Sequence, residues 1–356
     1  MAIERIDIGY FLHLSEKFPV LDVRSPSEYK HAHLPGAFSV PIFSDEERKI
    51  IGTAYTKESR QIAVDHGLQF FSERMKNIYQ EVKNITDRIK NKNDFTANTL
   101  LVHCWRGGMR SDAVAWLLNL YGYKVFVLKG GYKAFRRWAL VQFEKKYPLR
   151  VLGGFTGSGK TEVLRELKER GKTVIDLEGL ANHKGSAFGS LGGDAQPSHE
   201  MFENLLAIEL WEIEIHYNGD AQTKSEIWIE DESVHIGRVG IPKIFWQQMR
   251  ESPLVFLEIP FQERVKYISG HYGKFEKHQL IECILKIQKR LGGLNTKNAI
   301  QFLNEENYAS AFSILLKYYD KMYNESLRNR QGIKGLLHKI FCEKVEAENA
   351  ARLIDQ

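Results

Sequence analysis

The residues Gly-Phe-Thr-Gly-Ser-Gly-Lys-Thr at 154–161 form a complete phosphate-binding P-loop, and this motif constrains the fold more than any other feature. The motif requires a β-strand that leads into the loop and an α-helix that begins at its lysine. A strand-like run at 149–152 precedes the loop, and a helical pattern runs from Lys160 to about Arg170. We therefore expect a parallel α/β unit with an anion site at this strand end.

Each residue of the P-loop has an expected role. Lys160 would neutralise the outer phosphoryl oxygens, and the Thr161 hydroxyl would coordinate Mg²⁺. The motif indicates a diphosphate, although no element for a nucleotide base stands out in the sequence. The residues expected to surround the phosphates are Gly154, Thr156, Gly157, Ser158, Gly159, Lys160 and Thr161.

A second segment that contributes to Mg²⁺ binding is expected where the strand 227–229 ends in Glu-Asp-Glu. We favour Asp231 as the Mg²⁺ residue, with Glu230 next, and the alternative is a solvated strand end. Downstream of the strand 173–177, a loop at 179–198 occupies the position that contacts the acceptor in small-molecule kinases. This loop could bind substrate, close over the site as a lid, or be a flexible surface loop, and the sequence leaves these three interpretations open. Its candidate substrate residues are Asn182, His183, Lys184 and Ser186.

A cysteine loop, His-Cys-Trp-Arg-Gly-Gly-Met-Arg-Ser at 103–111, follows the predicted strand 99–102. A thiol has a pKa of about 8.5, so Cys104 needs nearby stabilisation to react as a thiolate. Arg106 and Arg110 bring positive charge, and the helix that follows adds its free N–H groups. The alternative is a buried structural cysteine. The loop residues expected to form the anion-binding nest are Gly107, Gly108, Met109 and Ser111.

Such a loop can hold a persulfide, a selenosulfide or a transferred oxyanion. The spacing from Cys104 to Arg110 also fits a cysteine phosphatase, so sulfur or selenium transfer and phosphate hydrolysis both stay open at this point. The cysteines Cys104, Cys283 and Cys342 are too few for a disulfide framework or a zinc site. Cys283 and Cys342 fit small core positions.

Composition predicts a globular protein of two or three domains in its 356 residues. The apolar runs are strand-sized and the N-terminus is polar, so we expect no membrane segment and a cytoplasmic location. The net charge of +5 gathers in the stretches 121–150 and 261–297, each with eight Lys or Arg. Aromatic residues interleave with them, which suits RNA contact, although solvated helix faces would give the same pattern.

The order of expected elements divides the chain. A first α/β unit spans 1–145 and carries a helical insertion at about 44–93. A second α/β unit containing the P-loop spans 146–262. Residues 263–356 are expected to form a helical C-terminal region.

The segments flanking the cysteine loop decide between the two chemistries. Leu-Asp-Val-Arg-Ser-Pro-Ser-Glu-Tyr at 21–29, His-Leu-Pro-Gly-Ala-Phe-Ser-Val-Pro at 33–41 and Leu-Lys-Gly-Gly-Tyr at 128–132 resemble a rhodanese domain. The fold class predicted is therefore a rhodanese-like parallel-sheet domain, then a P-loop NTPase-like parallel-sheet domain and the helical region. This resemblance favours sulfur or selenium transfer over phosphate hydrolysis.

The fusion of these two domains, together with Leu-Glu-Gly-Leu-Ala-Asn-His-Lys-Gly-Ser at 177–186 and Trp-Ile-Glu-Asp-Glu-Ser at 228–233, resembles the bacterial tRNA 2-selenouridine synthases. The resemblance implies a transferase that acts on the wobble-position 2-thiouridine in the tRNA anticodon arm. Geranyl diphosphate would first alkylate the sulfur, and selenium from selenophosphate would then replace the S-geranyl group.

The same resemblance assigns partners and roles. Cys104 would carry selenium as a selenylsulfide, with Arg106 and Arg110 stabilising the loop anion. Geranyl diphosphate and selenophosphate would be co-substrates, with no tightly bound cofactor, and Mg²⁺ would accompany the diphosphate. The expected partners are tRNA, held by the two basic stretches, and selenophosphate or its synthase. The sequence leaves selenium and sulfur both open as the cargo.

Overall fold

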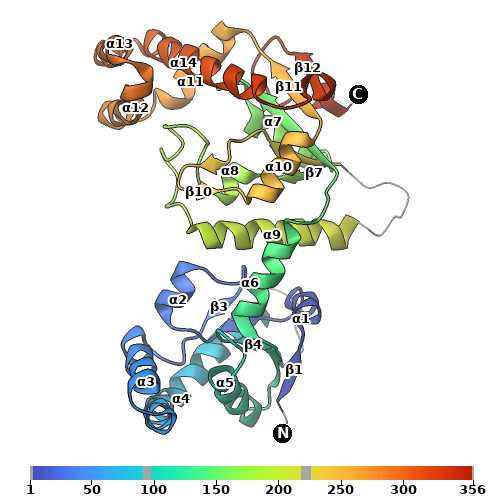
Figure 1. Cartoon of the computed structure of the whole chain (residues 1–356), viewed down its shortest axis with the longest axis vertical. Coiled ribbons are helices and arrows are strands. Elements are labelled where there is room, and N and C mark those ends of the chain that lie inside the picture. The colour runs from blue at the N-terminus through green and yellow to red at the C-terminus, as the bar shows by residue number, and fades with distance from the viewer. Residues whose placement is uncertain (1–2, 91–97, 218–225, 355–356) are drawn as a thin grey trace. The chain divides into compact units, whose positions relative to one another are not determined.

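The computed structural model describes residues 3–90, 98–217 and 226–354, and the chain divides into two compact units. The first unit is Met1–Gln142 and the second is Phe143–Gln356. Figure 1 draws the first unit from blue to green and the second from green to red. Each unit contains its own five-stranded sheet, in agreement with the two predicted α/β units.

Helices and strands alternate through most of the N-terminal unit. Its elements are β1 (Glu4–Ile6), α1 (Ile8–Ser15), β2 (Val20–Asp22), α2 (Pro26–His31), β3 (Phe38–Ser39), α3 (Asp45–Lys57), α4 (Arg60–Lys90), β4 (Thr99–His103), α5 (Met109–Leu120), β5 (Lys124–Leu128) and α6 (Gly131–Gln142).

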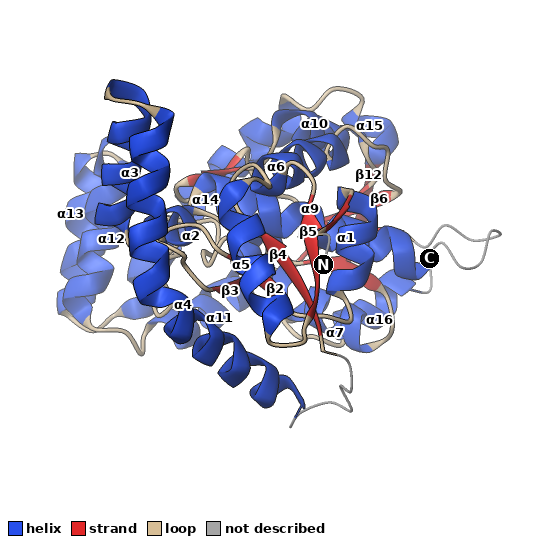
Figure 2. Ribbon diagram, turned by 90° about the horizontal axis from the view of Figure 1, so that it is seen from below, coloured by secondary structure: helices blue, strands red, loops and turns tan. Residues whose placement is uncertain are grey.

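The N-terminal sheet has the strand order β1-β5-β4-β2-β3, and every pair in it is parallel. The strands β2 and β4 are almost entirely buried, which explains their continuous apolar runs. In Figure 2, β2, β4 and β5 lie among the surrounding helices. Because β4 is central, its carboxyl end carries Cys104 into a site that both neighbouring strands can approach.

Two helices separate β3 from β4. A capping box starts α3, since the Ser44 hydroxyl accepts the Glu47 N–H at 3.2 Å and the Glu47 carboxylate accepts the Ser44 N–H at 2.7 Å. The helix α4 follows and packs along α3, and Phe71, Ile78 and Val82 of α4 enter the core. Residues 91–93 of the predicted insertion lie outside the described residues.

The C-terminal unit begins with the P-loop strand. Its elements are β6 (Leu149–Gly154), α7 (Lys160–Glu169), β7 (Thr173–Ile175), α8 (Leu177–Leu180), α9 (His199–Tyr217), β8 (Ile227–Glu230), β9 (His235–Ile236), β10 (Val239–Gly240), α10 (Lys243–Glu251), β11 (Leu254–Glu258), α11 (Phe261–Tyr272), α12 (Lys277–Leu291), α13 (Gly293–Asn304), α14 (Tyr308–Arg328), α15 (Ile333–Leu336), β12 (Leu337–Phe341) and α16 (Asn349–Ile354).

The second sheet has the order β12-β11-β6-β8-β7 and is also parallel throughout. The region after residue 262 is mainly helical, as predicted, but β12 returns to the sheet as an edge strand beside β11. Only Ile340 of its five residues is buried, so its sequence lacks the apolar run of a central strand. The helices α11 to α14 share a separate apolar cluster that includes Tyr272, Leu280 and Phe312.

No helix among the described residues is long and apolar enough to span a bilayer. This finding agrees with the strand-sized apolar runs of the sequence.

The backbone of the cysteine loop is hydrogen-bonded to the backbone at the start of α6. The Tyr132 N–H donates to the Cys104 carbonyl at 2.8 Å, and the Lys133 N–H donates to the Trp105 carbonyl at 3.0 Å. Gly131 has a φ of +58°, and a Cβ placed on it would lie 2.3 Å from the Cys104 carbonyl oxygen. The loop therefore holds its shape only if residue 131 has no side chain.

We predict that Gly131→Ala lowers the free energy of unfolding of the N-terminal unit by about 3 kcal/mol, from backbone strain plus overpacking. Gly36→Ala is the matched control, because Gly36 also has a positive φ but a Cβ there would meet nothing within 4 Å. Hydrogen exchange of peptides from β4 and β5 in urea measures the change. An equal loss in the free energy of unfolding in the two variants would contradict the conclusion that the close approach to Cys104 excludes a side chain at residue 131.

Candidate functional site

Cys104 follows directly after β4 and is 3% exposed. Its Sγ lies 3.3 Å from the Ser111 hydroxyl, which comes from the first turn of α5. The Ser111 hydroxyl is also 2.9 Å from the Gly108 carbonyl oxygen. The predicted loop residues Gly108 and Ser111 therefore meet at the sulfur.

The pKa of Cys104 is lower than that of an ordinary thiol. Burial alone raises the pKa, but the Ser111 hydrogen bond, the Arg110 charge and the backbone of Gly108 and Arg106 lower it further than burial raises it. By contrast, burial raises the pKa of both Cys283 and Cys342. Cys104 is thus the cysteine that the structure prepares as a thiolate.

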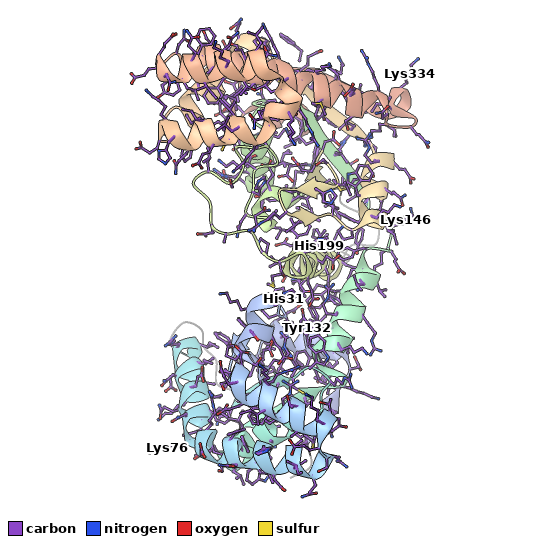
Figure 3. The ribbon with its side chains drawn as sticks, turned by 60° about the vertical axis from the view of Figure 1, so that its left-hand side comes forward. His31, Lys76, Tyr132, Lys146, His199 and Lys334 are labelled. Carbon is purple, nitrogen blue, oxygen red and sulfur yellow. The ribbon has the colours of Figure 1, made fainter. Side chains whose placement is uncertain are left out.

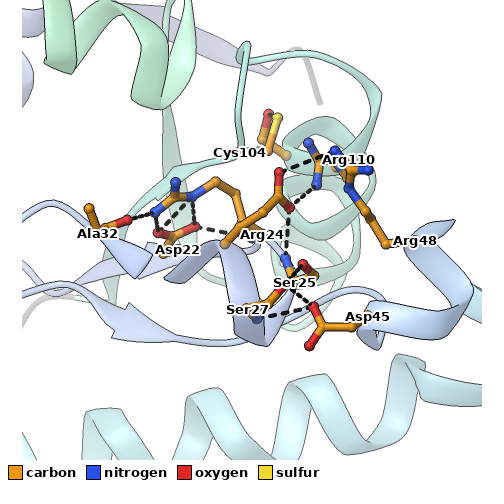
Figure 4. Close-up of polar contacts among 11 residues, drawn as sticks. Asp22, Arg24, Ser25, Ser27, Ala32, Asp45, Arg48, Cys104 and Arg110 are labelled. Carbon is orange, nitrogen blue, oxygen red and sulfur yellow. Dashed lines mark hydrogen bonds and ion pairs between the residues drawn. The ribbon is translucent and has the colours of Figure 1, made fainter. Parts of the chain in front are cut away.

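Arg110 divides its charge between the sulfur and a carboxylate. Its Nη1 lies 3.0 Å from Glu28 Oε2, and Arg48 approaches the same carboxylate from α3 at 3.6 Å (Figure 4). Burial raises the pKa of Glu28, but Arg110, the Ser25 N–H and Arg48 bring it below its usual range. Glu28 therefore fixes the position of the Arg110 guanidinium beside the cysteine loop.

Two of the other predicted residues of this loop lie at its surface, and the third is half-buried at a turn. Arg106 and Met109 are exposed, and Gly107 adopts a positive φ of +63° where the chain turns. Arg106 contributes through its backbone, as described for the Cys104 pKa. Its guanidinium is therefore at the rim of the loop rather than against the sulfur.

A buried ion pair supports the loop from behind. The Arg24 guanidinium donates to both oxygens of Asp22, with Nη2 at 2.6 Å from Oδ2, and also to the Ala32 carbonyl at 2.8 Å (Figure 4). The Arg24 Cζ lies 3.8 Å from the ring centroid of Tyr132. Tyr132, labelled in Figure 3, is fully buried, and its N–H holds the Cys104 carbonyl.

A cavity of about 660 Å³ opens beside Cys104 within the N-terminal unit. Its walls come from α3, α4, the residues after β3 and the cysteine loop. One wall of the cavity is hydrocarbon and includes Ile42, Phe43, Ile51, Ala63 and Phe71. This cavity could not be predicted from the sequence, because it depends on how two helices pack.

The P-loop lies between β6 and α7, as the motif requires. The Lys160 ammonium donates to the Gly154 carbonyl at 3.2 Å. Arg264 holds the loop from outside, since its guanidinium donates to the Thr156 carbonyl at 3.1 Å and pairs with both oxygens of Asp320. Arg264 belongs to the second basic stretch, yet it is buried and serves the loop.

Acidic groups gather beside Lys160. The Thr161 hydroxyl donates to Glu178 at 3.2 Å. Burial, followed by the repulsion of Glu178, raises the pKa of Glu232 to about 8, although Lys160 opposes the rise. Burial is also the main cause that raises the pKa of Glu178. At neutral pH this pair of carboxyl groups retains a proton.

Asp231 lines the same cavity, but its carboxylate is already hydrogen-bonded to protein groups. Its two oxygens accept from the Tyr323 hydroxyl at 2.5 Å and from Arg330 at 3.3 Å. Glu230, the second candidate, is fully buried and accepts the Leu177 N–H at 3.0 Å. The carboxylates on the Thr161 side of the site are Glu178 and Glu232, and the sequence analysis did not single them out. A role for Asp231 at Mg²⁺ stays a prediction.

The structure separates the four candidates of the 179–198 loop. Lys184 and Ser186 line the P-loop cavity, and the Lys184 ammonium lies 2.9 Å from the His271 ring. Asn182 instead donates to the Ala195 carbonyl at 3.4 Å, and neither Asn182 nor His183 is among the lining residues. Half of the predicted set therefore faces the anion site.

The P-loop cavity measures about 650 Å³ and has two different sides. One side is the glycine loop with Lys160, Arg165, Lys184 and Arg290. The other side is formed by α11 and α14 and is rich in aromatic rings. Its apolar and aromatic lining residues are Tyr267, Ile268, Tyr272, Tyr318, Tyr319, Met322 and Tyr323.

Three aromatic residues of the first basic stretch pack in the core. Tyr132, Phe135 and Phe143 are buried, so these three rings cannot stack on bases. Lys124, Lys129 and Lys133 are exposed, so the stretch can contact phosphates. RNA contact by this stretch stays a prediction.

Comparison with known proteins agrees with both halves of the structure. A family model described as the tRNA 2-selenouridine synthase AAA domain matches residues 147–339, and a rhodanese-like domain model matches residues 9–137. These matches confirm the predicted fold class.

Curated relatives align over nearly the whole chain. The tRNA 2-selenouridine synthase of Sulfurovum sp. (strain NBC37-1) is 34% identical, with 92% of this chain and 93% of the relative covered. The proteins of the same name from Marinobacter nauticus and Nitrosomonas eutropha are 32% and 31% identical, each with 88% of this chain and 89% of the relative covered. With the anion loops, the two sheets and these relatives in agreement, the chain belongs to the tRNA 2-selenouridine synthase family.

Proposed function

We propose that the protein converts wobble-position 2-thiouridine in tRNA to 2-selenouridine by S-geranylation followed by selenation. Family membership supports a tRNA-modifying enzyme that selenates the base. The observation that carries the proposal is the Cys104 sulfur, which has a lowered pKa at the end of β4 and opens into a cavity. Such a sulfur is suited to carry selenium to an electrophilic carbon.

The first step is assigned to the P-loop cavity. In geranyl diphosphate, the bond between carbon 1 and oxygen breaks, the diphosphate leaves with the electron pair, and the thiouridine sulfur bonds to carbon 1. The base loses its N3 proton to water in the same step. Lys160 and the loop N–H groups would stabilise the charge on the leaving group. The rings on the opposite side would pack against the geranyl chain, and their π-faces suit the partial positive charge on its allylic carbon.

A magnesium ion fits this cavity as a partner of the diphosphate. Among the described residues, no three His, Cys, Asp or Glu side chains form a metal cluster, and Mg²⁺ commonly binds through substrate phosphates plus one or two protein oxygens. Thr161 and Glu178 would supply those oxygens, because their side chains already meet. When bound, the ion would neutralise charge on the diphosphate.

The second step is assigned to Cys104. Alkylation turns the thiocarbonyl sulfur into a good leaving group. The terminal selenium of the Cys104 selenylsulfide bonds to carbon 2 of the base, the bond from carbon 2 to sulfur breaks, and geranyl thiolate departs. A second thiol then forms a disulfide with Cys104 as the sulfur–selenium bond breaks, which releases 2-selenouridine. The selenium of selenophosphate would displace that thiol from Cys104, and water would take the phosphoryl group as phosphate, which restores the selenylsulfide. Arg110 and the loop N–H groups would stabilise the anionic selenium carried on Cys104, as they stabilise its thiolate. Selenophosphate, or its synthase, would deliver the selenium.

The tRNA anticodon arm is the macromolecular partner in this proposal. Exposed lysines of the stretch 121–150 supply charge for its phosphates. Because the proposed substrate is tRNA, we infer a cytoplasmic location.

Replacing the thiol separates the two steps. We predict that Cys104→Ser abolishes selenation and leaves geranylation within about twofold of the wild type, because only the second step uses the sulfur. Mass spectrometry of tRNA nucleosides, after incubation with geranyl diphosphate and selenophosphate separately and together, measures both products. Cys283→Ser is the control, since Cys283 is a core residue. Normal selenation by the Cys104 variant would refute its assignment.

Removing the P-loop charge has the opposite effect. We predict that Lys160→Ala slows geranylation about 100-fold or more, because one stabilising group is lost from the leaving diphosphate. Lys168→Ala, an exposed change in the same helix, should retain full activity. The same nucleoside assay applies, with geranyl diphosphate alone. A rate near that of the wild type would place the diphosphate elsewhere.

The lowered pKa of Cys104 predicts its reactivity with pH. Iodoacetamide should alkylate Cys104 at lower pH than an ordinary thiol, and Ser111→Ala should move the profile to higher pH, because the thiolate loses a hydrogen bond. Peptide mass spectrometry follows the rate at each pH. Cys283 and Cys342, whose pKa values burial raises, serve as internal references. An unchanged profile in Ser111→Ala would contradict this account of the thiolate.

A further inference from the structure

The cavity beside Cys104 has a composition that the proposed selenium chemistry alone does not explain. A selenium donor such as selenophosphate is small and charged, whereas this cavity of about 660 Å³ has the size of a site for an organic ligand. Its deep wall is hydrocarbon, with Ile42, Phe43, Ala63 and Phe71 all buried. An apolar group is the chemistry that such a wall selects.

Two glycines in helix interiors make room for this cavity. Gly52 lies within α3 and Gly67 within α4, and both line the cavity. Neither has a positive φ. A Cβ would meet nothing closer than 3.8 Å at Gly52 and 3.7 Å at Gly67. Because glycine weakens a helix and neither backbone nor packing demands it here, the space that the two missing side chains leave is their evident contribution.

The charged side chains that line the cavity are all cationic. They are Arg48, Arg106 and Arg110, and Arg48 and Arg106 are exposed. Arg48 and Arg110 pair with Glu28, so the exposed Arg106 is the cation that a ligand's anion would meet. A ligand that combines an apolar part with a neighbouring anion suits this lining. An RNA nucleotide whose base carries a hydrocarbon chain meets both requirements.

We propose that this cavity binds the prenyl chain of the S-alkylated tRNA base and thereby places carbon 2 of that base beside Cys104. The inference rests on the proposed function, since it takes the S-geranyl base as the substrate of the second step. It adds that the N-terminal unit has a prenyl site of its own, distinct from the diphosphate cavity. Binding of the chain would favour the alkylated base over unmodified 2-thiouridine.

The test fills the cavity from one wall. Gly52→Leu adds a side chain that helices favour, so α3 should form normally. With selenophosphate and no geranyl diphosphate, this variant should show a KM for S-geranyl tRNA raised at least tenfold. Its KM for S-methyl tRNA should stay within twofold of the wild type. Geranylation of 2-thiouridine tRNA should be unchanged, so S-geranyl tRNA should accumulate when both donors are present.

Matched variants isolate the effect of volume. Gly52→Ala adds only a methyl group, and Thr53→Leu adds the same side chain at the next, exposed position outside the cavity lining. Both should behave as the wild type. Val64→Trp fills the cavity from α4 and should repeat the effect of Gly52→Leu even if the latter folds poorly. An unchanged KM for S-geranyl tRNA in both filled variants would overturn the proposal. A loss of geranylation as large as the loss of selenation in these variants would also overturn it.

A binding measurement separates this inference from the proposed function. Titration of the full chain with S-geranyl-2-thiouridine nucleoside should change the fluorescence of Trp105, which lines the cavity, and S-methyl-2-thiouridine should bind at least tenfold more weakly. The fluorescence change should be absent in Trp105→Phe, which would show that Trp105 is its source. If binding is seen and is lost in Gly52→Leu while the wild type selenates no tRNA, the prenyl site stands and the proposed function fails. Equal binding of both nucleosides would overturn the prenyl site.

Discussion

Parallel pairing of the strands is the constraint on which both anion sites depend. Every neighbouring pair in the two five-stranded sheets is parallel, so the carboxyl ends of the strands meet at one edge of each sheet. The chain must then cross back through a helix, and the helix start presents unpaired N–H groups at that edge. Cys104 follows β4, and the P-loop follows β6. The two sites share this origin although one presents a sulfur and the other is proposed to bind phosphates.

The thiolate results from opposing effects. Burial beside the cavity raises the pKa of Cys104, whereas the Ser111 hydroxyl, the Arg110 charge and the loop backbone together lower it by more. Arg110 also pairs with Glu28. Glu28 fixes the position of the guanidinium and reduces the charge that the sulfur experiences.

Sequence reasoning succeeded where chemistry is local and failed where it is tertiary. The P-loop and the Cys104 loop were found because their glycines, cations and nucleophile lie within a few residues of one another. Glu178 and Glu232 were missed as a pair because 54 residues separate them and only the sheet joins them. The edge strand β12 was missed because its partner β11, rather than an apolar run, defines it. Glu28 lay inside a recognised segment, yet its partner Arg110 is 82 residues away.

A prenyl group in both proposed steps explains why each unit contains a cavity with an apolar side. Both cavities would bind the geranyl chain through apolar contacts. The geranyl chain alone therefore cannot distinguish the diphosphate donor from the alkylated base. The polar part of each ligand must make the distinction. A diphosphate needs converging N–H groups and Lys160, which the C-terminal unit provides, whereas an RNA backbone needs separated, exposed cations such as Arg48 and Arg106. In this proposal, the anion attached to the geranyl chain decides which of the two cavities the ligand enters, and therefore which step takes place. The contacts to the geranyl chain itself are of the same kind in both cavities.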